Sequence, residues 1–328
     1  MAVTLPAALL APYERFTLYN SPYPAHDRGC AVDLYPAAAI AAHPGGRTPA
    51  PSPVAGEVLD TRSVAAPSRP YAADRDHLVL VDVERPAPVA GLVARLLHVE
   101  PSVAPGDRVD VGDAVGTLVR SGYFAPWVPD HVHLGFREPG ADPYRAAGSL
   151  RLEPGVDVEP LAWDGTGEVV ASDDSYAVLD SPAHPAPGDR WVGVGAAVGA
   201  GATVGTGATV GDGGSAGADA DPATAVLDGG LPHYAGGGLL GADAPDGPVS
   251  LAGHRVGVAA GRDAAWDDVA VRANGRPVTG LSLFCARDAG FGAKLVGEGL
   301  DLAVGERVAV SIVPAGEGAG SRAPVTDG

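Results

Sequence analysis

The sequence is poor in cysteine and lysine, with two cysteines, Cys30 and Cys285, and one lysine, Lys294. Two cysteines are too few for a disulfide framework or for a four-thiolate zinc site. No apolar run reaches the roughly 18 residues that a membrane-spanning helix needs, and no basic segment precedes the short apolar stretch at the N-terminus. We therefore expect a cytoplasmic protein with free thiols and no membrane partner.

Basic residues are scarce relative to acidic ones: the chain has 22 Lys and Arg residues and 40 Asp and Glu residues, which gives a formal net charge of −18. This balance argues against nucleic-acid binding through a basic patch. A strongly acidic surface keeps a protein soluble where salt screens its self-repulsion. Together with the near absence of lysine, the composition predicts a protein from a salt-accumulating halophile.

Long helices are also unexpected, because 31 prolines and 47 glycines interrupt the chain. The length favours two domains. We predict a mostly β protein, with an antiparallel or barrel-like β domain over residues 1–150 and a second β-rich, sandwich-like or barrel domain over residues 151–328.

The first predicted domain carries strand and turn patterns at hairpin spacing. Residues 131–137 (HVHLGFR) alternate strictly, which places His131 and His133 on one face of a strand. Turns are expected at 105–107 and 112–113. Residues 51–59 are expected to form a turn that enters a strand, and further strands are expected over 77–83 and 93–99.

The second predicted domain contains short β-like segments and a Gly/Ala-rich insertion near 193–225. Val192, Val198, Val204 and Val210 are each followed by glycine in a six-residue repeat. Such repeats can build a parallel β-helix, but four of them cannot bury their own face. We favour a low-complexity insertion over a β-helix. Cys285 is expected in a buried strand.

The order of motifs in the first domain is similar to that of the lysostaphin-type zinc metallopeptidases, the peptidoglycan endopeptidases of the LytM kind. The resemblance rests on the succession SPVAGEVLDT, HLVLVDVE, LLHVEPSVAPGDRVDVGDAVGTLV and HVHLGFR over roughly residues 20–140. It implies a duplicated hybrid motif fold with one zinc ion per chain. It also implies that His133 is a zinc ligand, and that His98 and His131 flank the reacting water as catalytic groups.

The sequence departs from the family where the first ligand motif, H-x-x-x-D, is expected. Asp33 matches its aspartate, but Gly29 stands where the histidine belongs. His26 and Cys30 are the nearest substitutes, since zinc accepts imidazole and thiolate. We prefer His26, which gives His26, Asp33 and His133 as the metal ligands; a turn before the strand would bring His26 within reach.

These residues support a zinc-dependent hydrolase that cleaves an amide bond in a peptide-like or small-molecule substrate. One alternative is a degenerate module of the same fold that binds a metal or a partner without catalysis. A weaker alternative is a histidine-based phosphotransfer domain that uses His98 and His131. Tyr123, Phe124 and Trp127 are candidates either for lining a substrate groove or for packing their loop. The sequence indicates neither the substrate nor the oligomeric state.

Overall fold

The computed structural model describes residues 2–41, 47–199, 223–241 and 245–316. The chain divides into two compact units, residues 1–157 with 285–288, and residues 158–284 with 289–328. Strands dominate both units, which confirms the mostly β fold predicted from the sequence. Among the described helices, none is long and apolar enough to cross a membrane.

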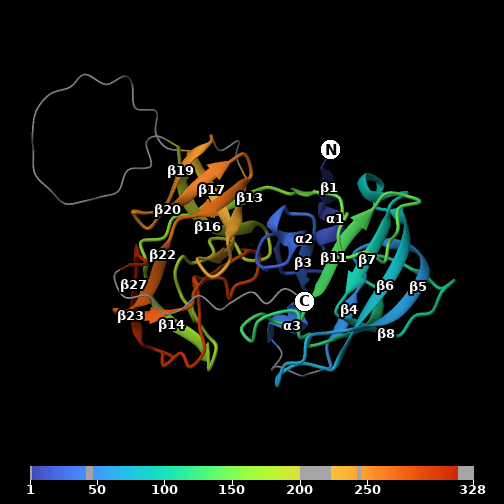
Figure 1. Cartoon of the computed structure of the whole chain (residues 1–328), viewed down its shortest axis with the longest axis horizontal. Coiled ribbons are helices and arrows are strands. Elements are labelled where there is room, and N and C mark those ends of the chain that lie inside the picture. The colour runs from blue at the N-terminus through green and yellow to red at the C-terminus, as the bar shows by residue number, and fades with distance from the viewer. Residues whose placement is uncertain (1, 42–46, 200–222, 242–244, 317–328) are drawn as a thin grey trace, which may run out of the picture. The chain divides into compact units, whose positions relative to one another are not determined.

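The main sheet of the first unit is antiparallel throughout, with strand order β25-β2-β3-β11-β7-β6-β5-β9 (Figure 1). A second sheet has the order β4-β10-β8, and β1 pairs with β12 in parallel. The strands are β1 (Val3–Pro6), β2 (Arg15–Thr17), β3 (Val32–Tyr35), β4 (Pro49–Pro51), β5 (Ala55–Ala65), β6 (Arg75–Arg85), β7 (Val93–Leu97), β8 (Val99–Pro101), β9 (Arg108–Val109), β10 (Ala114–Leu118), β11 (Val132–Arg137), β12 (Leu152–Gly155) and β25 (Cys285–Ala286).

The helical segments of the first unit are short: α1 (Ala7–Leu10), α2 (Pro24–Asp27), α3 (Ala37–Ala41) and the 3-10 turn η1 (Ala87–Val89). The unit extends past residue 150, where the sequence suggested a boundary, because β12 pairs with β1. Cys285, buried in β25, lies beside Phe16 of β2 and so joins the first unit from a distant part of the chain.

Alternation along β11 separates the core of the first unit from its polar face. Val132, Leu134 and Phe136 are fully buried on one face, as their apolar character favours. His133 and Gly135 lie on the other face. Because β11 is flanked by β3 and β7, this polar face borders on side chains from both neighbours.

Glycine is required where two strands of this unit approach closely. A Cβ atom on Gly56 in β5 would lie 1.9 Å from the backbone oxygen of Asp82 in β6. No side chain fits that space, so the glycine of the segment SPVAGEVLDT is explained by strand packing.

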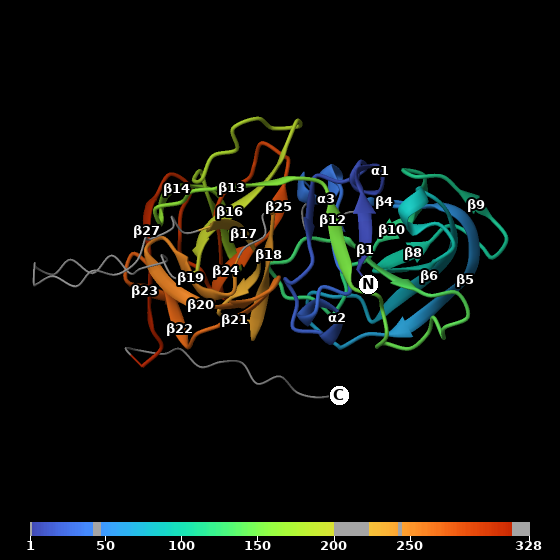
Figure 2. The same cartoon turned by 90° about the horizontal axis from the view of Figure 1, so that it is seen from above.

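The second unit contains a closed barrel of six antiparallel strands in the order β16-β17-β18-β21-β20-β19, with β19 returning to β16. Figure 2 shows these strands together. Of the two architectures that the sequence left open, the barrel is present. The barrel strands are β16 (Trp191–Val198), β17 (Ala223–Leu231), β18 (Gly236–Leu240), β19 (Gly247–Leu251), β20 (His254–Ala260) and β21 (Asp263–Trp266).

Outside the barrel, β13 runs parallel to β16, and β24 pairs with β17 and with β26. The strands of this unit outside the barrel are β13 (Val158–Leu161), β14 (Thr166–Asp173), β15 (Tyr176–Leu179), β22 (Val269–Ala273), β23 (Arg276–Val278), β24 (Gly280–Leu283), β26 (Lys294–Val296) and β27 (Arg307–Pro314).

The Gly/Ala-rich insertion predicted near 193–225 includes part of the barrel. Val192 and Val198, the first two valines of the repeat, belong to β16, and residues 223–225 begin β17. Val204 and Val210 lie outside the described residues.

Candidate metal centre

Asp33 and His133 face each other on adjacent strands of the first unit. They are register partners in the antiparallel pair β3–β11, which brings their side chains together on one face of the sheet. The Nδ1 atom of His133 lies 2.9 Å from Oδ1 of Asp33. Only 5% of the Asp33 side chain is exposed, against 15% of the His133 side chain, so solvent reaches this pair from the histidine side.

His26 reaches the same point from α2, the helical turn that precedes β3. Pro24 begins this turn, and the amide of Cys30 donates to the Ala25 carbonyl as the chain leaves it. His26 Nδ1 lies 2.7 Å from the Leu18 carbonyl oxygen. Because that carbonyl can only accept, Nδ1 carries the proton and Nε2 keeps a lone pair. The Nε2 atom lies 3.1 Å from His133 Nδ1 and 3.4 Å from Asp33 Oδ1.

Gly29, which stands where the resemblance calls for a histidine, has a φ of 57°. This left-handed conformation suits glycine and is costly for a residue with a Cβ atom. The turn therefore favours glycine at position 29, and the imidazole of the group comes from position 26 instead.

His26, Asp33 and His133 form a group in which one donor atom from each residue lies within 4.8 Å of the other two. This is the set of ligands that the sequence predicted. Among the described residues no other group of histidine, cysteine and acidic side chains meets this condition. Cys30, the alternative ligand, is outside the group, and its Sγ lies 3.7 Å from the Arg28 carbonyl oxygen.

The electrostatics of the group favour the protonation states that bind metal. Burial alone would raise the pKa of Asp33. The charges of His131 and His26 and hydrogen bonds from nearby imidazoles outweigh it, and hold that pKa well below its usual range. Burial lowers the pKa of His133 to about 4, against the opposing pull of Asp33. Near neutral pH Asp33 is therefore a carboxylate and His133 a neutral imidazole.

His131 and His98, the two histidines predicted to be catalytic, border on this group. His131 Nδ1 lies 2.8 Å from the Pro129 carbonyl oxygen, and its Nε2 lies 3.4 Å from Asp33 Oδ1. The ring of His98 lies 5.0 Å from that of His131 and 5.6 Å from that of His133, centroid to centroid. All five predicted site residues thus lie together in the first unit.

His98 reaches the site because the strand that carries it is broken. The sequence predicted one strand over 93–99, but β7 ends at Leu97 and His98 has a φ of 66°. Leu97 is the register partner of His133, so in a regular strand residue 98 would point to the opposite face of the sheet. The left-handed residue breaks the alternation and allows the His98 ring to face His133.

Aromatic side chains pack against the two bordering histidines. Phe124 lies 4.7 Å from the His131 ring and 5.2 Å from the His98 ring, and Tyr35 lies 5.1 Å from the His131 ring. Of the three aromatic residues that the sequence proposed for a groove, Phe124 contacts the site most closely. Tyr123 is 6.4 Å from His98, whereas Trp127 packs with Tyr35 and Phe124 in a small apolar cluster.

Sequence reasoning missed Asp76, whose Oδ2 lies 2.6 Å from His98 Nδ1 and accepts a 2.7 Å hydrogen bond from the Ser121 hydroxyl. Asp76 is one of 40 acidic residues and lies 22 positions from His98. Its place at the start of a strand gave no signal that separates it from other acidic residues.

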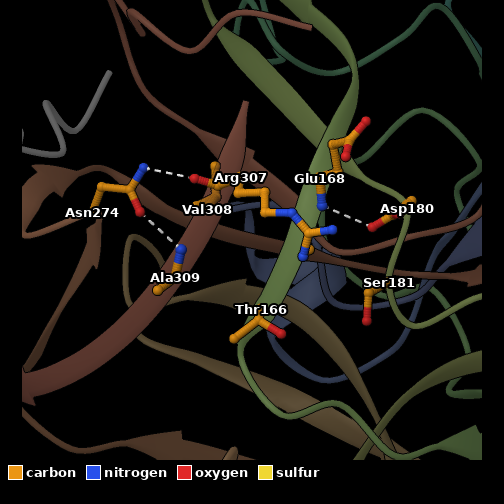
Figure 3. A pocket seen from close by; sticks show the side chains of 9 residues that line it. Thr166, Glu168, Asp180, Ser181, Asn274, Arg307, Val308 and Ala309 are labelled. Carbon is orange, nitrogen blue, oxygen red and sulfur yellow. Dashed lines mark hydrogen bonds between the residues drawn. The ribbon is translucent and has the colours of Figure 1, made fainter. Parts of the chain in front are cut away.

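The second unit has a polar hollow between β14, β27 and the turn at Asn274 (Figure 3). Two of its polar side chains bond to backbone: the Asn274 side-chain amide donates to the Arg307 carbonyl and accepts from the Ala309 amide, and Asp180 accepts from the Glu168 amide. These bonds hold strands together and leave no convergent set of catalytic groups among the residues that line the hollow.

Comparisons with known proteins agree with the division of the chain. The N-terminal model of a family described as a domain of unknown function (DUF8155) matches residues 4–154, and its C-terminal model matches residues 159–313. No curated protein matches the chain. A solved structure described as a novel M23 metalloprotease, pseudoalterin, from the deep sea is similar at 16% identity and a TM-score of 0.26, over 43% of this chain and 72% of that one. A score this low establishes neither a shared fold nor a shared activity.

Proposed function

We propose that the first unit is a zinc-dependent hydrolase that cleaves an amide bond in a peptide-like or small-molecule substrate. One observation carries the proposal: three atoms that can each bind a metal, His26 Nε2, Asp33 Oδ1 and His133 Nδ1, meet at separations of 2.9 to 3.4 Å. An imidazole nitrogen that carries a lone pair and an ionised carboxylate oxygen are both zinc ligands, so this convergence suits a metal ion.

The spacing of these atoms fits a zinc ion. Zinc in a tetrahedral site has bonds of about 2.0–2.2 Å to nitrogen and oxygen, which separates neighbouring ligand atoms by roughly 3.3–3.5 Å. The three observed separations reach 3.4 Å, so the group needs little expansion to hold the ion. Two imidazoles and one carboxylate are also a ligand set used by hydrolytic zinc sites, with a fourth position left for water or substrate.

The residues around the ligands support their role. Leu18 accepts from His26 Nδ1, which fixes the ring and directs Nε2 toward Asp33. Such outer partners orient metal-binding imidazoles and select their tautomer. A bound zinc ion would supply a water of lowered pKa and would polarise a substrate carbonyl.

In the proposed reaction His98 and His131 move protons beside the ligands. Each has its Nδ1 committed, to Asp76 and to the Pro129 carbonyl respectively, so each offers Nε2 to the reacting atoms. An Nε2 lone pair accepts a proton as an amide is attacked, and the same atom returns it to the leaving amine. Phe124 packs against both rings.

The proposal is tested by incubating the zinc-loaded full chain with a pool of synthetic peptides and measuring new termini by mass spectrometry. We expect cleavage by the wild type and by His254→Ala, which removes an imidazole of the second unit. We expect no cleavage by His133→Ala. Cleavage that survives His133→Ala would contradict the proposal, and zinc binding without cleavage of any peptide would favour a non-catalytic metal-binding module.

A further inference from the structure

Asp76 is fully buried and takes no part in the ligand group, yet both of its carboxylate oxygens are occupied. Oδ1 accepts from the backbone amides of His77, at 2.7 Å, and His98, at 3.0 Å. Oδ2 accepts from the Ser121 hydroxyl at 2.7 Å and lies 2.6 Å from His98 Nδ1. Two of these four contacts go to a single residue, so Asp76 fixes both the backbone and the ring of His98.

The charge state of Asp76 is set by these contacts. Burial alone would raise its pKa, but the charge of His98 and the hydrogen bonds from His98, Ser121 and the His77 amide lower that pKa to about 2. Asp76 is therefore a carboxylate at all ordinary pH values, and a carboxylate only accepts hydrogen bonds.

The contact between Asp76 and His98 determines which ring nitrogen of His98 faces the site. With Nδ1 directed at Asp76, the other ring nitrogen, Nε2, is the one left for the site, and the described residues make no hydrogen bond to it. The ring packs edge-on to His131 and Phe124, at 5.0 and 5.2 Å between centroids. These aromatic contacts restrict its rotation, so the choice of tautomer decides what Nε2 can do.

We propose that Asp76 is a positioning residue that holds His98 in the Nδ1–H tautomer, with the lone pair of Nε2 directed toward the ligand group. The importance of this for catalysis rests on the proposed function. In that reaction Nε2 takes one proton and later gives it to the leaving amine, while the Nδ1 proton stays in its bond to Asp76. Asp76 stabilises the transient imidazolium and transfers no proton itself.

Replacing Asp76 with asparagine reverses this preference without a change of size. The side-chain oxygen of asparagine would stay with the two backbone amides, which leaves the NH2 group to face His98. An NH2 group is a donor, so His98 Nδ1 must accept and the ring proton moves to Nε2. Ser121→Ala is the matched control, because it removes one hydrogen bond to Asp76 and leaves the Asp76–His98 contact intact.

The test is a two-bond 1H–15N correlation spectrum of the 15N-histidine-labelled full chain near pH 8, where an ordinary histidine with a pKa of about 6.5 is neutral. His98→Asn identifies the signals, since asparagine tolerates a positive φ better than most residues. We expect the Nδ1–H pattern for His98 in the wild type and in Ser121→Ala, and its replacement by the Nε2–H pattern in Asp76→Asn.

Two results would overturn the inference: an Nε2–H pattern in the wild type, or an unchanged pattern in folded Asp76→Asn. If circular dichroism shows that Asp76→Asn is unfolded, the wild-type spectrum alone decides. Zinc content separates this inference from the proposed function, because the tautomer is measured in chelator-treated protein. If the wild type binds no zinc, the metal site is refuted, but the role of Asp76 in fixing the His98 tautomer is not affected.

Discussion

The two units build the same kind of β scaffold but use its irregular positions differently. Outside glycine, a positive φ occurs among the described residues at His98 in the first unit and at Ala252 and Asn274 in the second. Ala252 and Asn274 lie in tight turns between paired strands, β19–β20 and β22–β23. His98 instead turns an imidazole toward a group of converging side chains.

In the first unit, regular strands and the segments beside them both contribute to the group of converging side chains, since Asp33 and His133 lie within β3 and β11. His26 comes from a helical turn, His98 from a break between two strands, and His131 from the residue before β11. The polar hollow of the second unit, by comparison, uses its side chains to bond neighbouring backbone (Figure 3).

The largest expected difference between the units is their response to zinc. A ligand that binds only the folded state, at a thousand times its Kd, stabilises it by about 4.1 kcal/mol. We expect hydrogen exchange of amides in β3 and β11 to slow strongly on zinc addition, while amides in β17 and β18 exchange as before. His133→Ala should remove the effect, and equal protection of both units would contradict the location of the site.

The acid stability of the first unit should depend on Asp76. Because its pKa in the folded protein is depressed to about 2, its contribution is present above the ordinary carboxylate pKa and is lost as pH falls through about 2. For a carboxylate shifted from 3.9 to 2.0 that contribution is about 2.6 kcal/mol. Urea unfolding between about pH 5 and pH 2 should therefore show a steeper loss in the wild type than in Asp76→Asn; parallel losses would refute the assignment.

The turn residue of the second unit should matter for stability alone. Asn274→Ala removes the bonds to Arg307 and Ala309 and leaves a β-carbon in a left-handed position. We expect a loss of about 2 kcal/mol in urea unfolding with unchanged zinc content. A change in zinc content would show that this turn also affects zinc binding, and would contradict the expectation that it matters for stability alone.

The smallest expected effect concerns the position at which the family histidine is missing. Gly29→His should cost about 1 kcal/mol, because its φ of 57° disfavours a side chain. In a His26→Ala background it should not restore zinc binding, which metal analysis of the double variant would show. Restored binding would mean that the turn can rearrange to bring residue 29 to the ligand group.

The sequence predicted the β fold and the alternation of β11, because period-two patterns reflect which face of a strand is buried. It also named His26, Asp33 and His133 together, since a turn before β3 was the simplest way to replace the histidine missing at position 29. The geometry of His98 was not predictable, because a positive φ at a histidine has no signature in composition or alternation. Asp76 was missed since its contact with His98 depends on strand pairing between β6 and β7.

Zinc content by mass spectrometry, on protein purified in molar KCl without chelator, tests the metal centre most directly. We expect about one zinc per chain in the wild type and in His98→Asn, and none in His133→Ala. No zinc in the wild type after zinc is supplied, or equal zinc in the wild type and His133→Ala, would contradict this expectation.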